Sequence, residues 1–194
     1  DELPKTNRQL RLALHTDRHS ALLYSASDIS VWNTEKIEEH PFLQRIGPDI
    51  LNPNLTWREV AERLQSKTFA GRALNSVYLD QAFLAGLGNY LRSEILFIAG
   101  IHPARKAREL SKGEIGKLAR ITLDISQRSY ASQGVTIPDQ QYKALKKKGV
   151  SFGKARFFVF SRANQPCRVC KTKIKRSTAN SRRIYTCAIC QPNE

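Results

Sequence analysis

Four cysteines occupy one short pattern near the end of the printed sequence. Cys167 and Cys170 are separated by two residues, sixteen residues follow, and Cys187 and Cys190 repeat the same spacing. Two thiolate pairs of this kind, each on its own turn, supply the four soft ligands of one tetrahedral zinc ion. Two disulfide bonds or a redox pair are the alternatives, but the metal pattern uses every cysteine and the sequence shows no secretion signal. The pattern predicts a structural zinc site, because four cysteines leave no open position for water or substrate.

The segment between the two cysteine pairs, residues 171–186, has the length of a β-hairpin and is strongly basic. A hairpin held rigid by a metal can enter a DNA groove and contact phosphate groups. We therefore expect a basic zinc ribbon. Its basic residues are Lys171, Lys173, Lys175, Arg176, Arg182 and Arg183.

The composition indicates a polyanionic partner. The chain has 32 Lys and Arg against 17 Asp and Glu, a formal net charge of +15 and a pI near 10.0. Nucleic acid is the first candidate and an acidic membrane surface the second. No apolar run approaches the ~20 residues that span a bilayer, which disfavours the membrane. Between Lys143 and Arg183 there are fourteen Lys or Arg and no acid. A solvated basic face is the simplest interpretation, but the complete absence of acids favours a phosphate-facing surface.

A glycine turn offers a second place for an anion. In Gly86-Leu87-Gly88-Asn89 the glycines let backbone N–H groups approach a phosphate, and a helix N-terminus follows. Glycine turns between helices are common and an asparagine there is often only a cap, so this motif alone is weak.

Local patterns predict the elements that position these residues. Strands are expected near residues 10–14 and 21–24, and because a lone hairpin is marginal in water they are expected to belong to a larger sheet. Capping boxes at Thr56 and Ser111 predict helices from about residue 56 and from about residue 112 to 128.

A helical hairpin is expected between those two helices. Residues 79–83 and 89–98 are helix-compatible and are separated by the glycine turn, and Gly100 and Pro103 end the second helix. Residues 131–156 are polar and basic and are predicted to form a mobile loop.

Taken together, the helical hairpin and the cysteines make the chain resemble the bacterial formamidopyrimidine-DNA glycosylase and endonuclease VIII family. Residues 79–92, LDQAFLAGLGNYLR, resemble its helix-two-turn-helix, and the spaced cysteines resemble its zinc finger. Residues 22–29, LLYSASDI, and 40–45, HPFLQR, resemble the endonuclease VIII branch. The match covers essentially the whole chain, with four separate motifs in the right order.

The resemblance implies an α+β fold in three parts. Residues 1–50 would be a partial N-terminal β-sandwich, residues 51–160 a helical domain with the helix-two-turn-helix, and residues 161–194 a zinc ribbon. It also implies a bacterial, cytoplasmic and nucleoid-associated enzyme, monomeric when complete, that acts on double-stranded damaged DNA.

The implied activity is base excision repair, in which the enzyme removes oxidised bases, mainly pyrimidines, and cuts the abasic strand as an AP lyase. By position in the family's motifs, Arg45 and Asn89 would bind DNA near an everted nucleotide. Arg182 would be the finger arginine that contacts the flanking phosphates and assists the last elimination. Asp80 and Glu94 lie in apolar stretches and are expected to be buried hydrogen-bonding carboxylates rather than catalysts.

One departure from the family concerns the nucleophile. Family members begin with a proline whose amine attacks the sugar, followed by a glutamate acid, and a lysine lies on a nearby strand. The printed chain has no methionine and begins with Asp1, which matches a point well inside the family's first domain. We therefore expect a truncated chain that binds DNA and catalyses little. The α-amine of Asp1 is a nucleophile in principle only.

Two other classes of protein remain open. A naturally shortened, non-catalytic zinc-ribbon DNA-binding module would share these motifs, and an upstream Pro-Glu start would exclude it. An unrelated zinc-ribbon protein of transcription or translation would not explain the helical hairpin or the matches near Tyr24 and Arg45.

Overall fold

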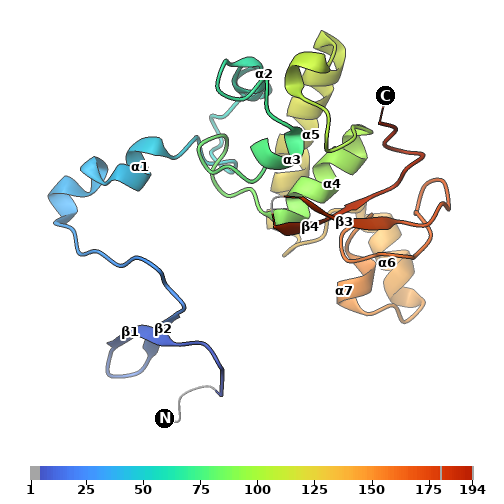
Figure 1. Ribbon diagram of the computed structural model, residues 1–194. Coiled ribbons are helices and arrows are strands. Elements are labelled where there is room, and N and C mark those ends of the chain that lie inside the picture. The colour runs from blue at the N-terminus through green and yellow to red at the C-terminus, as the bar shows by residue number, and fades with distance from the viewer. Residues whose placement is uncertain (1–4, 180, 194) are drawn as a thin grey trace. The chain divides into compact units, whose positions relative to one another are not determined.

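The computed structural model describes residues 5–179 and 181–193 of the 194-residue chain (Figure 1). The chain divides into two compact units, residues 1–44 and residues 45–194. The α-amine of Asp1, considered above as a nucleophile, lies outside the described residues. Within the described part of the chain, every helix is too short or too polar to cross a lipid bilayer.

The first unit contains the predicted hairpin. Strands β1 (Leu10–His15) and β2 (Ser20–Tyr24) pair antiparallel, and the 3₁₀ helix η1 (Thr34–Glu39) and the short helix α1 (Pro41–Arg45) follow. Among residues 5–44 no side chain is buried, and Leu14 is 60% exposed. The two strands form a two-stranded sheet within the described residues, so the expected larger sheet stays a prediction.

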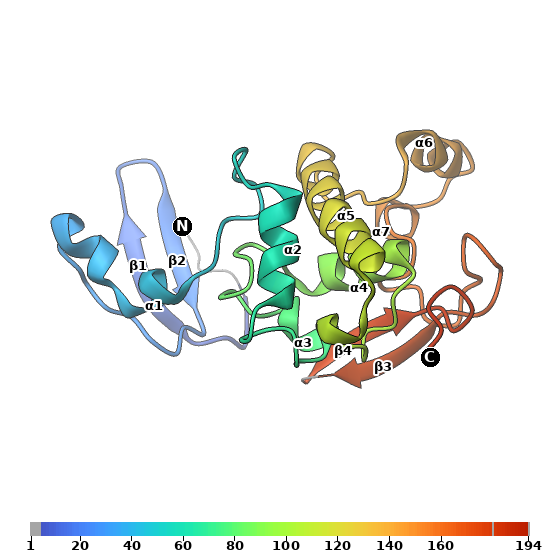
Figure 2. The ribbon, with the colours of Figure 1, turned by 90° about the horizontal axis from the view of Figure 1, so that it is seen from above.

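Three helices build the core of the second unit. These are α2 (Trp57–Gln65), α4 (Asn89–Ala99) and α5 (Lys112–Ala131). Both predicted capping boxes are present at the starts of α2 and α5, because each N-cap hydroxyl accepts an N–H and each N3 glutamate bonds back to the cap. Figure 2 shows α4 and α5 side by side, and apolar side chains of all three helices form one cluster. The predicted helices at these three places are confirmed.

The expected helix over residues 79–83 is wrong. The helix before the glycine turn is α3 (Leu74–Val77), and residues 78–84 form turns. Arg63 takes the carbonyls of Ala82 and Phe83, at 2.6 and 2.9 Å, and the Asp80 carboxylate accepts the N–H of Ala82 at 2.9 Å. The N–H of Ala82 and the carbonyls of Ala82 and Phe83 would have no partner within so short a helix, so these side-chain contacts hold the segment as turns and override its local helix propensity.

The predicted loop over residues 131–156 is also wrong. It contains helices α6 (Asp139–Lys147) and α7 (Phe152–Ala155), which lie next to each other in both views. The rings of Tyr142 and Phe152 meet edge to face with their centroids 6.4 Å apart. Polar and charged residues make up most of α6 and conceal this small apolar face in the sequence.

The cysteine region forms a ribbon that packs on α4. Strands β3 (Lys175–Ala179) and β4 (Arg182–Thr186) pair antiparallel, as the spacing predicts. A short 3₁₀ helix, η2 (Ala107–Glu109), lies earlier in the chain, between α4 and α5. The ribbon has its own small core, in which Phe97 is the contribution of α4. The buried members are Phe97, Val159, Cys167, Ile174, Tyr185 and Cys187.

Candidate metal centre and nucleic-acid interface

The four cysteines meet at one point in space. Their sulfur atoms all lie within 4.8 Å of one another. The Sγ atoms of Cys167 and Cys190 are 3.9 Å apart and those of Cys170 and Cys187 are 3.3 Å apart. All four side chains are free thiols. Four thiolates around one zinc at about 2.3 Å lie about 3.8 Å apart, so this donor set fits a tetrahedral zinc ion.

The electrostatics of the cluster also favour a cation. The hydroxyl and N–H of Thr172 lower the pKa of Cys170 to about 6. Burial and the neighbouring thiols raise the pKa of Cys190 above its ordinary value. Four adjacent sulfurs therefore resist simultaneous ionisation unless a positive ion compensates them, which is the role of a bound metal.

Gln191 attaches the second cysteine pair to the helical core. Its Oε1 accepts the N–H of Cys187 at 3.1 Å, and its Nε2 donates to the carbonyl of Ile101 at 3.0 Å. The side chain is buried, so both bonds are protected from water. The ribbon is thus fixed to the end of α4. No motif in the sequence marks Gln191 for this task.

Asn89 joins the start of α4 to the ribbon. Its Nδ2 donates to the carbonyl of Arg183 at 3.0 Å, and its Oδ1 accepts from Arg92 at 2.6 Å. Gly88 is the N-cap of α4 and supplies no side-chain cap, so Asn89 is a helical residue and not a cap. The glycine turn before it requires Gly86, whose φ is +89° and whose Cβ would lie 3.2 Å from Ile50 Cγ2.

Arg92 is a buried cation at this junction. It is fully buried and donates to the carbonyls of Asn75 and Arg183 at 3.0 and 3.1 Å. Burial and the nearby charge of Arg182 lower the pKa of Arg92 to about 10. Within the described residues, the partners of its side chain are neutral oxygens, and its Nε makes no hydrogen bond. No carboxylate of the described residues pairs with Arg92 or Arg182, and two such arginines create a strongly positive point that favours an anion.

The structure brings two of the predicted site residues together. A shallow cavity of about 320 Å³ lies between α4 and the ribbon, and Asn89 and Arg182 both line it. Arg45 is not among the lining residues and lies exposed at the end of α1. The cavity residues are Asn89, Phe160, Ser161, Ser181, Arg182, Arg183 and Tyr185.

Glu94 organises the chain that enters the ribbon, which we call the strap, residues 154–160. Glu94 is fully buried on α4, and its two oxygens accept three consecutive backbone N–H groups of residues 158–160, each at 2.8 Å. Thr136 contacts the same carboxyl at 2.5 Å. Burial raises the pKa of Glu94 although these hydrogen bonds act in the opposite direction. The expectation of a structural carboxyl is confirmed here, whereas Asp80 is partly exposed and pairs with Arg72 at 2.7 Å.

Arg168, between the first two cysteines, binds the other side of the strap. Its Nε donates to the carbonyl of Phe157 at 2.9 Å and its Nη2 to that of Lys154 at 2.8 Å. These carbonyls lie at and just beyond the end of α7, where no helical partner is available to them. The metal-binding turn therefore holds α7 directly.

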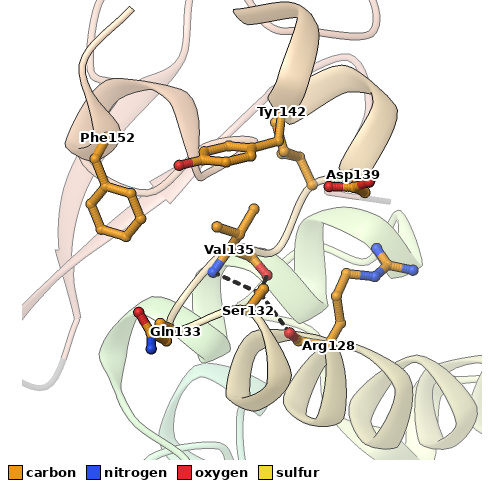
Figure 3. Close-up of a pocket in the computed structure, with 8 residues that line it drawn as sticks. Arg128, Ser132, Gln133, Val135, Asp139, Tyr142 and Phe152 are labelled. Atoms are coloured by element: carbon orange, nitrogen blue, oxygen red, sulfur yellow. Dashed lines mark hydrogen bonds between the residues drawn. The ribbon is translucent and has the colours of Figure 1, made fainter. Parts of the chain in front are cut away.

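A second cavity of about 430 Å³ lies between the end of α5 and the α6–α7 pair (Figure 3). Figure 3 shows Tyr142 and Phe152 on one side of it and Arg128 and Ser132 on the other. The Ser132 hydroxyl bonds to the backbone of Arg128 and Val135, which fixes the turn that forms the floor. Its walls are thus partly aromatic and partly polar.

Comparison with known proteins gives relatives over nearly the whole chain. The model of the formamidopyrimidine-DNA glycosylase H2TH domain matches residues 46–141. The chain is 46% identical over 190 residues to "Endonuclease 8" of Escherichia coli strain UMN026, covering 98% of this chain and 69% of that protein. It is 45% identical over 190 residues to "Endonuclease 8" of Shigella sonnei, with the same coverage.

Solved structures show the same fold. The MutM (Fpg) protein of Thermus thermophilus superposes with a TM-score of 0.71 at 26% identity, over 96% of this chain and 73% of that one. The Fpg of Lactococcus lactis in complex with FAPY-dG-containing DNA superposes with a TM-score of 0.65 at 21% identity, over 82% of this chain. The chain spans 56% of that Lactococcus protein.

Proposed function

Because the chain belongs to the formamidopyrimidine-DNA glycosylase and endonuclease VIII family, we propose that it acts in base excision repair on double-stranded damaged DNA. The proposed reaction is removal of oxidised bases, mainly pyrimidines, followed by cleavage of the abasic strand as an AP lyase. The proposed setting is the bacterial cytoplasm at the nucleoid, with a monomeric enzyme. The preference for pyrimidines is what the resemblance to endonuclease VIII implies, and the chain is 46% identical to an endonuclease 8.

The observation that carries this proposal is the positive cavity between α4 and the ribbon. Asn89 and Arg182 line it, and the buried Arg92 adds a charge that no acid in the described part of the chain pairs with. A target base must leave the stack before an enzyme can reach its glycosidic bond, and the kinked backbone then needs clamps on its phosphates. We assign the phosphate contacts to Asn89 and Arg182. Arg45 is assigned to the everted nucleotide's surroundings by its place in the family motif alone.

Zinc is proposed as the resident metal, held by Cys167, Cys170, Cys187 and Cys190. Bound there, it would supply structural rigidity and no Lewis-acid site, because the four thiolates fill its coordination shell. The protein's own groups do the remaining work. The ribbon presents Arg182 at the cavity, and Asn89 fixes the ribbon through the carbonyl of Arg183.

Replacing Arg182 with alanine is expected to weaken binding to abasic-site DNA about tenfold or more. A phosphate contact by a charged donor contributes about 1.5–3 kcal/mol, and about 1.4 kcal/mol corresponds to a factor of ten. A gel shift with a duplex that contains an abasic site or an oxidised pyrimidine measures the change. Arg108→Ala is the matched control, because Arg108 is an exposed arginine on η2 and does not line the cavity. Equal affinities for the two variants would contradict the assignment of Arg182.

Borohydride trapping on the same DNA distinguishes a chain that carries the catalytic amine from one that only binds the duplex. None of the site residues assigned above supplies the amine that a proline supplies in the family, so we expect residues 1–194 to bind the duplex without forming a trapped Schiff base. Efficient trapping would show that an amine within these residues does the chemistry. Failure to distinguish damaged from undamaged duplex would favour the non-catalytic zinc-ribbon module.

A further inference from the structure

The basic arm, which we define as residues 139–155 with helices α6 and α7, carries positive charge that the cavity does not use. Lys146 and Lys147 end α6 and Lys148 is its C-cap; all three are exposed, as is Lys154 on α7. None of the four lines the cavity that contains Asn89 and Arg182. These lysines therefore form a cluster separate from the residues assigned above.

No carboxylate in the neighbouring sequence neutralises this cluster. Asp139 is the acid of α6 and is already paired with Lys143 at 2.6 Å. After Asp139 the sequence has no further acid until Glu194. The three consecutive lysines at the end of α6 thus leave a net positive surface that attracts a polyanion.

The basic arm is held in place rather than attached by a free linker. On one side, Arg168 donates to the carbonyls of Lys154 and Phe157. On the other side, the N–H of Thr136 donates to the carbonyl of Arg156 at 3.0 Å. Both attachments fix the base of the arm, one of them to the turn that carries Cys167 and Cys170. A prepositioned charge loses less conformational entropy on binding than a charge on a disordered tail.

The arm has aromatic side chains that pair with each other, although Phe152 stays 42% exposed. Tyr142 packs edge to face against Phe152, and Tyr142 lines the second cavity together with Phe152. An amphipathic helix that binds lipid needs a broad exposed apolar face to insert, whereas α6 has only two large apolar residues, Tyr142 and Leu145, and both are half-buried. A regular phosphate backbone, which needs only cations, fits the surface better.

We propose that Lys146, Lys147 and Lys148, with Lys154, form a second phosphate-binding surface that contacts the DNA duplex independently of the ribbon. This inference rests on the proposed function, because the same duplex that enters the cavity would extend along the arm. The arm adds affinity that does not depend on the lesion, since phosphate contacts carry no base information.

The slope of binding affinity against salt concentration tests this proposal. The logarithm of the binding constant falls with the logarithm of the salt concentration, and each lost phosphate contact makes this fall less steep by about 0.9. The variant K146Q/K147Q/K148Q is expected to lower the slope by about 1 to 3 and to weaken binding equally on damaged and undamaged duplex. The matched control is K67Q/K112Q/K117Q, which removes the same charge from three exposed lysines outside the acid-free stretch. The control is expected to keep the wild-type slope.

Amine acetylation of the wild-type chain gives a second measurement that needs no variant to fold. Duplex DNA is expected to shield Lys146–Lys148 from the reagent and to leave Lys67 reactive. The inference is overturned if the two triple variants have the same salt slope, or if DNA leaves the arm lysines fully reactive. A wild-type chain that does not bind duplex at all would instead overturn the proposed function itself.

Discussion

Replacing Cys187 with serine is expected to abolish metal binding and to release the β3–β4 hairpin from α4. The Cys187 sulfur is buried and belongs to the cluster within 4.8 Å, so three thiolates and a hydroxyl would replace a closed shell. Structural zinc supplies about 10–16 kcal/mol of apparent binding free energy in zinc-finger peptides, more than a ribbon of this size gains from its small core. Metal content per chain and hydrogen exchange of residues 175–186 measure the effect.

The helical part of the second unit is expected to survive this substitution. Its apolar cluster is separate from that of the ribbon. The far-UV circular dichroism of α2, α4 and α5 should therefore persist while the amide hydrogens of the hairpin exchange freely with solvent. Val169→Ser is the control, because Val169 lies between two metal ligands, is 64% exposed and contributes no sulfur. Retention of one metal ion and a protected hairpin in the Cys187→Ser chain would refute the proposed zinc site.

Replacing Glu94 with alanine is expected to lower the free energy of unfolding by about 3 kcal/mol or more. Three backbone N–H groups of residues 158–160 would lose their shared acceptor, and each buried unsatisfied group costs about 1–3 kcal/mol. Glu94→Gln is expected to lie between wild type and alanine. Its amide keeps one acceptor oxygen but turns an NH₂ group toward a strap N–H. Urea unfolding followed by circular dichroism measures the order of the three chains.

Glu62→Ala is the matched control for this experiment. Glu62 is an exposed glutamate on α2, and surface substitutions of this kind usually change stability by less than about 0.5 kcal/mol. If Glu94→Ala were as stable as Glu62→Ala, the strap would not depend on the buried carboxyl.

Features encoded by neighbouring residues could be predicted from the sequence. The capping boxes at Thr56 and Ser111 specify their helices because the bonds that start each helix lie within four residues. The cysteine spacing likewise implies its own hairpin. The helix expected over residues 79–83 is absent for the opposite reason. The turns that replace it are held by Arg63, about twenty positions earlier, which donates to the carbonyls of Ala82 and Phe83.

The candidate site could be predicted only in part. Motif positions single out Asn89 and Arg182, which line one cavity, and their roles, like that of Arg45, stay predictions. The three-part division at residues 50 and 160 also stays a prediction. Arg92 and Arg168 were missed because their importance lies in which distant carbonyls they reach. An arginine inside the apolar stretch of α4 was the available signal for Arg92, since a charge on a buried helix needs a reason.

The backbone hydrogen bond between Thr136 and Arg156 has a consequence for how this fold can change over evolution. This hydrogen bond joins the point where the chain leaves the helical core to the point where it returns. Glu94 and Arg168 then form hydrogen bonds with the strap next to it. Residues 137–151, which precede α7, can therefore change in length and composition without moving the metal-binding turn or the cavity, because each doubling of a loop costs only about 0.6 kcal/mol. The proposed contacts of this segment with the duplex can therefore vary while the cavity that contains Asn89 and Arg182 keeps its geometry.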